Sequence, residues 1–368
     1  MRFTRLKVFA AAMGSLLTIA SLQANLAFSF APDAGTPQYV VDGFTLAASR
    51  WSAVLADNIT INLGIGFQSL PAGVIGETTS AYLQEPYTDV LAALTAGRTS
   101  ADDYTAVAHL PSGPNYSRLI NHTADNPNGA NSSTPYVHSL TPVAMTRANG
   151  KALGFLSPSP EVDAAIRFSS KVGFDFDPSD GTTSGQYDFA TLAAHEIGHV
   201  LGFESTVDQL EQLHGSGVAD QLPSTVLDLF RYSSASLAAG PGYTDCAADS
   251  RAKYFSVDGG QTKIAGFATG AVYGGGYQAS HWQEFTWVGL MDPTVFQGMQ
   301  RQLSRTDLWA FDAIGYTLVP EPGTCGLLAL GLLALRAATM RERLSGLSPI
   351  TACGPLADAR GSAARETA

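Results

Sequence analysis

The stretch that most constrains this chain is YDFATLAAHEIGHVLGF, residues 187–203, because it predicts a helix with a defined beginning and end. Asp188 is a good N-cap, and apolar side chains follow it at helical spacing. Gly202 can take the left-handed conformation that ends a helix. His195 and His199 are four residues apart, so their imidazoles project from one face of this helix, one turn apart.

Two imidazoles at this spacing can hold a tetrahedral zinc ion at about 2.0–2.1 Å. Glu196 adjoins the first histidine and can reach a zinc-bound water, taking its proton as the water attacks a carbonyl. The metal would supply polarisation and the carboxylate would supply the base. An accidental match to the His-Glu-x-x-His pattern is the alternative, and the helical context of His195 and His199 argues against it.

A third protein ligand must come from elsewhere, because Ser205, three residues past the glycine, is a poor zinc ligand. Residues 274–294 read GGGYQASHWQEFTWVGLMDPT and contain His281, with Met291 ten residues later in a Leu-Met-Asp-Pro turn. His281 can complete the zinc shell if the segment before it folds out as an insertion. The methionine turn would then form an apolar floor beneath the three imidazoles.

Two carboxylates compete with His281 for this role. Glu204 lies one residue short of the usual ligand position, and Asp208 lies three residues beyond it. Carboxylates are good zinc ligands, and either would make the distant histidine unnecessary. The spacing alone leaves all three candidates open.

The combination of HEIGHVLGF, a long insertion, SHW and LMDP resembles the leishmanolysin-type branch of the metzincin metalloproteases. It is more similar still to bacterial metalloproteases of that kind that carry a PEP-CTERM signal. The resemblance covers residues 188–205 and 277–316, and more weakly about 44–180. It implies that the zinc ligands are His195, His199 and His281. It also implies that Glu196 is the general base and that Met291 is the Met-turn residue.

The chain also departs from leishmanolysin. Its three cysteines are Cys246, Cys325 and Cys353, and only the first lies in the central part, so no internal disulfide framework can form there. No cysteine precedes residue 246, so none is available upstream to block the zinc as a latency switch.

The charge balance excludes some partners. Between residues 25 and 319 the chain carries 13 Lys and Arg against 28 Asp and Glu, a net charge of −15. A surface this acidic repels nucleic acid and anionic lipid, so we expect neither as a partner. It is compatible with the binding of cations.

Both ends of the chain are typical of targeting segments. Residues 1–24 have basic residues, an apolar run and then small residues, the pattern of a secretory signal peptide, with cleavage after Ala24 or, alternatively, Ala27. Residues 319–343 resemble a PEP-CTERM signal, which is held in the inner membrane and cleaved by an exosortase; an ordinary tail anchor is the alternative. Residues 344–368 form a low-complexity tail. These features predict export to the envelope or exterior of a Gram-negative bacterium.

The resemblance implies an α+β, zincin-like domain over residues 25–318. Its upper part, about 40–203, would hold a twisted sheet and the active-site helix, and its lower part, about 276–318, would be mainly helical or irregular, with the Met-turn. An insertion would span about 206–275. The residue patterns predict the following elements: helices at 44–56, 82–107, 207–213, 223–239 and 303–316, strands at 58–67 and 163–170, and a loop at 111–135.

Two further hypotheses concern the segment before the zinc helix. The strand at 163–170 lies where metzincins place the edge strand of the cleft, so a peptide substrate could pair with it. Asp175, Asp177 and Asp180 have hard oxygen ligands at a spacing that resembles a calcium-binding loop. The spacing is not that of a full EF-hand, and a solvated acidic turn is the simpler interpretation.

We therefore expect a secreted zinc metalloendopeptidase that hydrolyses polypeptides with Glu196 as general base. The rival hypothesis is a non-catalytic metal-binding protein of the envelope or extracellular matrix. The presence of Glu196 argues for the enzyme, because a structural zinc site needs no base beside the metal.

Overall fold

The computed structural model describes residues 26–215 and 222–320. The chain divides into two units, Met1–Val319 and Pro320–Ala368, and the described residues belong almost wholly to the first. That unit is a mixed α+β structure with several small sheets and, within the described ranges, eight α-helices. The predicted α+β class is therefore confirmed. The signal peptide, the low-complexity tail and nearly all of the predicted sorting segment lie outside the described residues.

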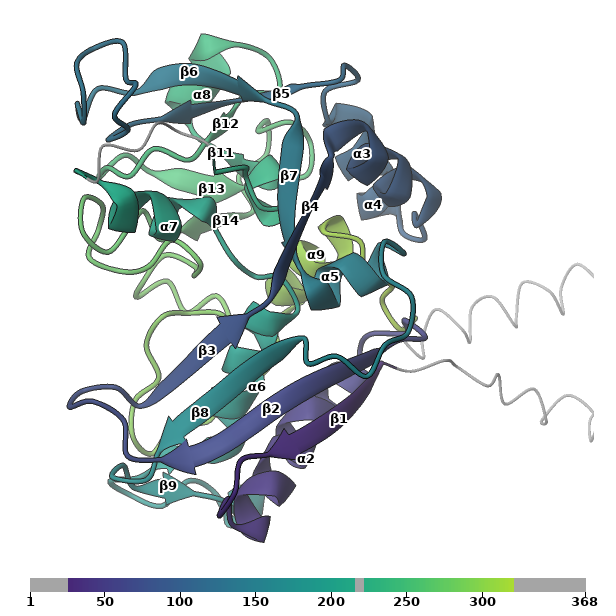
Figure 1. The fold of residues 1–368 in the computed structure, drawn as a ribbon, viewed down its shortest axis with the longest axis vertical. Helices are drawn as coiled ribbons and strands as arrows, with labels where there is room; N and C mark the ends of the chain where they lie inside the picture. Colours follow the sequence, from purple (N-terminus) through teal and green to yellow (C-terminus); the bar gives the residue numbers. More distant parts are fainter. Residues whose placement is uncertain (1–25, 216–221, 321–368) are drawn as a thin grey trace, which may run out of the picture. The chain divides into compact units, whose positions relative to one another are not determined.

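The largest sheet has four strands in the order β1-β2-β8-β3 (Figure 1). β1 (Ala27–Pro32), β2 (Thr60–Gln68) and β8 (Ala164–Ser169) are parallel, and β3 (Gly76–Ser80) runs antiparallel to β8. The strand predicted at 58–67 is confirmed as β2. Its alternate side chains are fully buried on one face, as a half-buried strand requires.

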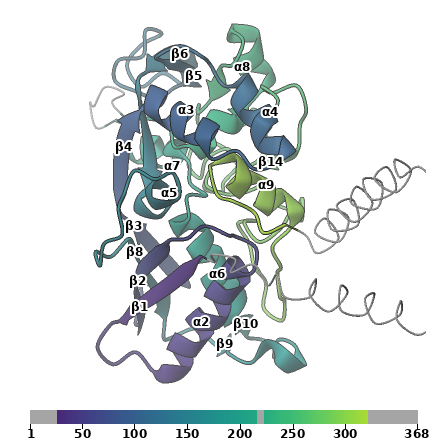
Figure 2. The same cartoon turned by 90° about the vertical axis from the view of Figure 1, so that its right-hand side faces the viewer.

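Two helices cover one face of this sheet, as Figures 1 and 2 show. They are α2 (Gln38–Ser52) and α6 (Phe189–Val200), and they pack against each other. The indole Nε1 of Trp51 in α2 donates a 2.9 Å hydrogen bond to the carbonyl of Ala194 in α6. The helix predicted at 44–56 is wrong at both ends: α2 begins six residues earlier, directly after Pro37, and ends at Ser52.

The predicted edge strand is wrong in position. The strand at 163–170 exists as β8, but it lies between β2 and β3, so its backbone is already paired on both sides. The edge strands of this sheet are β1 and β3, and the one that lines the cleft is β3, which the sequence does not predict. Its sequence, Gly-Glu-Thr-Thr-Ser, is short and polar, and it becomes a strand by pairing with β8.

The helix predicted at 82–107 is also wrong at its start. Tyr82–Pro86 forms strand β4, and only then do α3 (Tyr87–Ala96) and α4 (Ala101–His109) follow. Pro86 has no N–H to donate and cannot lie inside a helix, so the helix begins after it. β4 instead pairs with a strand from far along the chain, β7 (Pro142–Thr146).

Long-range pairing also overrides two other predictions. The span 111–135, predicted as loop, contains strand β5 (Tyr116–Ile120). The span 223–239, predicted as helix, is helical in the α form only at its end, in α8 (Ser234–Ala239). A short 3₁₀ turn, η2 (Leu227–Phe230), and strand β11 (Arg231–Tyr232) precede that helix.

The remaining strands form four small sheets: β4 with β7; β9 (Phe174–Asp175) with β10 (Tyr187–Asp188); β12 (Thr244–Asp245) with β5 and β6 (Tyr136–Leu140); and β11 (Arg231–Tyr232) with β13 (Lys253–Phe255) and β14 (Ala265–Phe267). Four of these strands, β11 to β14, come from the segment at about 206–275 that the sequence predicts as an insertion. Its side chains Phe230 and Phe255 are buried in the same hydrophobic core as α2 and α6, so this segment packs as part of the unit.

The last described helix, α9 (Arg305–Ala313), lies within the predicted helix at 303–316. α7 (Thr206–Leu213) agrees with the helix predicted at 207–213, and α5 (Arg147–Ala152) is a short addition. Over residues 26–215 and 222–320, no helix combines the length and apolarity needed to cross a bilayer.

Candidate metal centre

The helix that carries the histidine pair is confirmed in position and in both of its ends. The Asp188 carboxylate accepts a 2.6 Å hydrogen bond from the backbone N–H of Thr191 and caps α6. Gly202 has a φ of +113°, the left-handed conformation expected where the helix stops. The chain then turns sharply and continues into α7.

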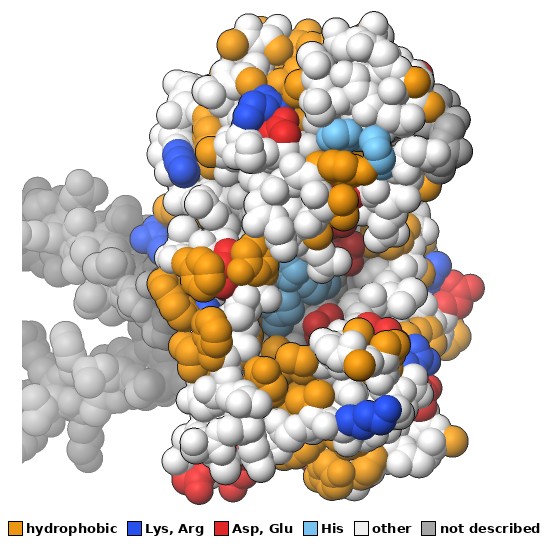
Figure 3. All heavy atoms as spheres, turned by 90° about the vertical axis from the view of Figure 1, so that its left-hand side faces the viewer, with side chains coloured by type: hydrophobic (Ala, Val, Ile, Leu, Met, Phe, Trp, Pro, Cys, Tyr) orange, Lys and Arg blue, Asp and Glu red, His pale blue; other side chains and the backbone are white. Residues whose placement is uncertain are grey.

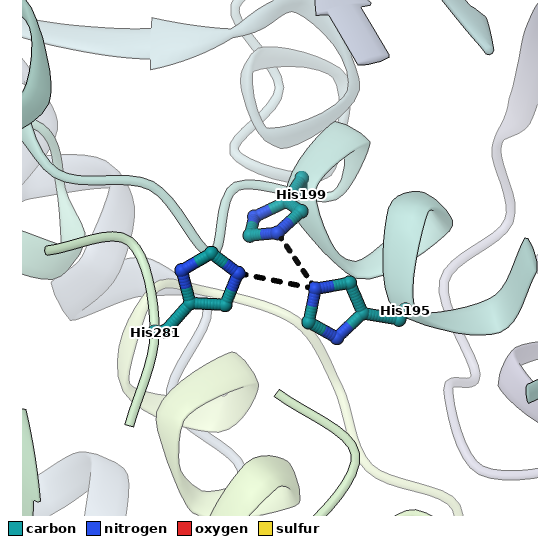
Figure 4. Close-up of side chains that lie close together, drawn as sticks. All are labelled: His195, His199 and His281. Atoms are coloured by element: carbon teal, nitrogen blue, oxygen red, sulfur yellow. Dashed lines mark hydrogen bonds between the residues drawn. The ribbon is translucent and has the colours of Figure 1, made fainter. Parts of the chain in front are cut away.

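The structure brings His195, His199 and His281 together (Figure 4). The Nε2 atoms of His195 and His281 are 3.2 Å apart, and those of His199 and His195 are 3.1 Å apart. Three nitrogens that bind one tetrahedral ion at about 2.0–2.1 Å lie roughly 3.3 Å from one another. The observed separations therefore fit a zinc-sized ion among the three rings.

Hydrogen bonds on the far side of each ring fix which nitrogen faces the centre. Nδ1 of His195 lies 2.8 Å from the carbonyl oxygen of Leu290, and Nδ1 of His199 lies 2.8 Å from that of Phe203. Nδ1 of His281 lies 3.1 Å from a third carbonyl, that of Gln278. A carbonyl can only accept, so each Nδ1 carries the proton and each Nε2 presents a lone pair. Three converging lone pairs are favourable when a cation lies between them.

The protonation state suits a metal ligand. Burial, and next the nearby His195, lower the pKa of His199 to about 3. Burial and the other two rings also lower the pKa of His281 well below its usual value. Both rings are therefore neutral at physiological pH, the form in which an imidazole binds a metal.

Glu196 lies beside the triad in a cleft of about 860 Å³. Figure 3 shows this cleft as a hollow with the pale-blue histidines at its bottom. The hydroxyl of Thr78, on the edge strand β3, donates a 2.5 Å hydrogen bond to Oε2 of Glu196. The charged side chains that line the cleft are all acidic, which raises the local concentration of cations: Glu77, Glu196, Glu204 and Asp208.

The two rival carboxylates do not join the histidine group. Glu204 accepts a short hydrogen bond from the Tyr82 hydroxyl and a 3.5 Å one from Ser80, and burial raises its pKa to about 7. Asp208 accepts hydrogen bonds from the segment just before His281. Of the three candidates left open by the sequence, only His281 lies with the helical pair.

Met291 lies against α6, the helix that carries His195 and His199. It is fully buried, and the carbonyl of the preceding Leu290 is the acceptor that orients His195. A Cβ added at Gly198, between the two helical histidines, would lie 2.4 Å from the Met291 sulfur. Glycine at this position therefore allows the methionine to approach the helix backbone.

We expect Gly198→Ala to lower the free energy of unfolding by about 1–2 kcal/mol, because the overpacking cost exceeds the gain in helix propensity. Urea unfolding of the variant against the wild type measures this. Gly113→Ala is the control, since a Cβ there meets nothing within 4 Å. Equal stability of Gly198→Ala and wild type would contradict this account of the glycine.

Sequence reasoning missed several residues that hold the centre together. Asp307 accepts hydrogen bonds from the Trp282 indole (2.8 Å) and from the backbone N–H of Leu290 (2.8 Å), and thus joins the residue after His281 to the start of the methionine turn. Its capping box with Ser304 can be read from the sequence, but its contacts with residues 282–291 cannot. Thr78 gave no signal at all, because its strand was not predicted.

The predicted calcium loop receives no comparable support. The carboxylate of Asp175 accepts hydrogen bonds from the backbone of Asp177 and from Thr183, and Asp177 accepts from Ser179. In the part of the chain that the structure describes, the three histidines are the one group of three such side chains whose ligand atoms come together. Calcium binding by Asp175, Asp177 and Asp180 stays a prediction.

Comparison with family models, with curated proteins and with solved structures finds no match to this chain. What can be said of the chain therefore comes from its own structure. It is a mixed α+β unit in which a histidine pair on a helix lies beside a third histidine at the bottom of an acidic cleft.

Proposed function

We propose that this protein is a zinc-dependent endopeptidase of the metzincin type, related to the leishmanolysin branch. The observation that carries the proposal is the convergence of three imidazole Nε2 atoms beside a carboxylate in an open cleft. Three protein ligands with a position left for solvent or substrate are typical of catalytic zinc, whereas structural zinc usually has four protein ligands.

A zinc ion held by His195, His199 and His281 would polarise a peptide carbonyl and make water acidic enough to react near neutral pH. Glu196 is placed to accept the proton of the attacking water and to return it to the leaving amine. Thr78 holds one carboxylate oxygen of Glu196 by its hydrogen bond and leaves the other for the water. The hydroxyl thereby orients the base without replacing it.

The free edge of β3 supports a polypeptide as the substrate. β3 lines the cleft along its whole length, and on its other side it is paired with β8. An extended peptide can add to such an edge through backbone hydrogen bonds, which would bring one of its carbonyls opposite Glu196. We therefore assign the pairing with a peptide substrate to β3 and not to the strand at 163–170, for which the sequence predicted it.

We also propose export of the protein to the envelope or exterior of the cell, with the C-terminal segment held transiently in the inner membrane until an exosortase-type enzyme cleaves it. Of the two predicted signal-peptide cleavage positions, Ala24 fits the fold better. Leu26 is buried, and its carbonyl accepts a 2.6 Å hydrogen bond from Ser52. Cleavage after Ala27 would remove this residue, and cleavage after Ala24 keeps it.

Hydrolysis of casein by the purified protein tests the proposed activity. We expect activity that a chelator abolishes and that stoichiometric zinc restores, because neutral imidazoles bind the metal reversibly. A folded protein that holds one zinc ion and cleaves neither casein nor a mixture of unstructured peptides would contradict the proposal. That result would favour the non-catalytic metal-binding protein of the envelope.

A further inference from the structure

His281 reaches the centre 82 residues after His199, so something must hold the returning chain in place. A long segment between two ligands costs conformational entropy, and a ligand at the end of a loosely held loop would bind the metal weakly. The contacts of the residues immediately before His281 show how the chain is held.

Asp208, in the first turn of α7, accepts three hydrogen bonds from two consecutive residues of the returning chain. The backbone N–H of Ala279 lies 2.6 Å from Oδ1, and the N–H and hydroxyl of Ser280 lie 2.9 Å and 2.5 Å from Oδ2. The Ser280 hydroxyl oxygen in turn accepts a 2.9 Å hydrogen bond from the N–H of Ser205. The start of α7 and the residue before the third ligand are thus directly joined.

Arg231, on β11, holds the same segment from its carbonyl side. Its guanidinium donates a 3.3 Å hydrogen bond to the carbonyl of Ala279 and a shorter one to the carbonyl of Ala268. The guanidinium also lies 4.8 Å from the ring of Phe267. Arg231 is 1% exposed, so these bonds are shielded from water. A carboxylate and a guanidinium therefore hold the two sides of the backbone at Ala279.

This hold also sets the orientation of the ring. The Nδ1 of His281 donates a hydrogen bond to the carbonyl of Gln278, the residue just before Ala279 and Ser280. The Nε2 position therefore depends on where the backbone of 278–280 lies. A small displacement of that backbone would move the nitrogen away from the other two, since coordination distances vary by only about 0.2 Å.

We propose that Asp208 is a positioning residue of the metal centre, which fixes the place and orientation of His281 by holding the backbone of Ala279 and Ser280. Arg231 assists it from the carbonyl side. Asp208 thus acts on the backbone beside a metal ligand and not on the metal itself, although its spacing in the sequence also fits a direct ligand. This inference rests on the proposed metal centre and extends it to residues that do not touch the ion.

Asp208→Asn in the full-length protein tests this, because the amide keeps the shape but replaces one of the two accepting oxygens by an NH2 group, which then faces the N–H of Ala279 or of Ser280. We expect zinc to bind 10–100-fold more weakly, the loss usual when a group that orients a ligand is removed. Competition with a chromogenic chelator measures the dissociation constant. The visible absorption of the cobalt(II)-substituted protein should change as well, since it reports the ligand geometry.

Glu211→Gln is the matched control. Glu211 lies on the same helix, one turn further on, and accepts hydrogen bonds from three backbone N–H groups of the same loop, those of residues 271–273. These residues lie about ten positions before His281. We expect this variant to lose a similar amount of thermal stability in the metal-free form, yet to bind zinc within about threefold of wild type and to keep the cobalt spectrum.

The possible outcomes separate the two proposals. If wild type binds zinc tightly and Asp208→Asn binds it equally well with an unchanged cobalt spectrum, the positioning role is overturned and the metal centre stands. If both carboxylate variants lose affinity equally, the effect is general loop stability, which also overturns it. If wild type binds no metal, both proposals fall. Should Asp208→Asn not fold, Ser280→Ala replaces it, with a 3–10-fold loss expected and an unchanged affinity overturning the role.

Discussion

Glu196→Gln is expected to lower peptide hydrolysis by roughly 10²–10⁴-fold while the zinc content and the dissociation constant for zinc stay near their wild-type values. The amide has nearly the shape of the carboxylate and can still accept the hydrogen bond from Thr78, but it cannot take a proton from water. The effect should therefore fall on kcat rather than on the stability of the fold. Initial rates on a fluorogenic peptide, with metal analysis of the same samples, measure both quantities.

Glu77→Gln provides the control for this experiment. Glu77 precedes Thr78 on β3 and also lines the cleft, but it is exposed, and strand alternation points it away from Glu196. We expect its rate to remain within about threefold of wild type. If the two variants lost activity equally, the charge of the cleft rather than a general base would explain the effect, and the proposed role of Glu196 would be wrong.

His281→Ala is expected to weaken zinc binding by about 10²-fold or more and to abolish hydrolysis. Four-ligand zinc sites bind with apparent free energies of about 10–16 kcal/mol, so one ligand contributes roughly 3 kcal/mol, which corresponds to a factor of about 10². Zinc stoichiometry after dialysis against a weak chelator measures the loss. His109→Ala is the control, because that histidine is exposed on α4 and should leave one zinc ion bound.

The same experiment distinguishes the ligands that the sequence left open. If His281→Ala kept wild-type affinity and Glu204→Ala or Asp208→Ala lost all of it, a carboxylate would be the third ligand and the resemblance to the leishmanolysin branch would fail. The hydrogen bonds of Glu204 to Tyr82 and of Asp208 to Ser280 make this result unexpected.

The parts of the centre that the sequence predicted are those determined locally. The α6 helix could be predicted because its cap, its apolar spacing and its terminating Gly202 all lie within one short stretch. His281 could be preferred over Glu204 and Asp208 only through the resemblance, because nothing in the intervening residues specifies how the chain returns. The structure supplies the missing reason in the hydrogen bonds of Asp208 and Arg231.

The parts that were missed depend on contacts between distant residues. β3 is polar and short, and it is a strand because β8 offers it a partner. Tyr82–Pro86 has apolar residues compatible with a helix, but pairing with β7 and the proline at its end decide otherwise. Asp307 is a helix-capping residue by its sequence, and its contacts with the methionine turn appear only in three dimensions.

The link between α7 and the residue before His281 has one more consequence. Because the chain leaves the three histidines at residues 205–208 and returns beside these residues at Ser280, the position of His281 does not depend on how many residues lie between the two sides. Homologous chains could lengthen or shorten the exposed turns of that excursion, and acquire new surfaces there, without any adjustment of the three imidazoles. The contacts of Ser205 and Asp208 with Ser280 would therefore let the residues between them change during evolution while the three histidines keep their positions.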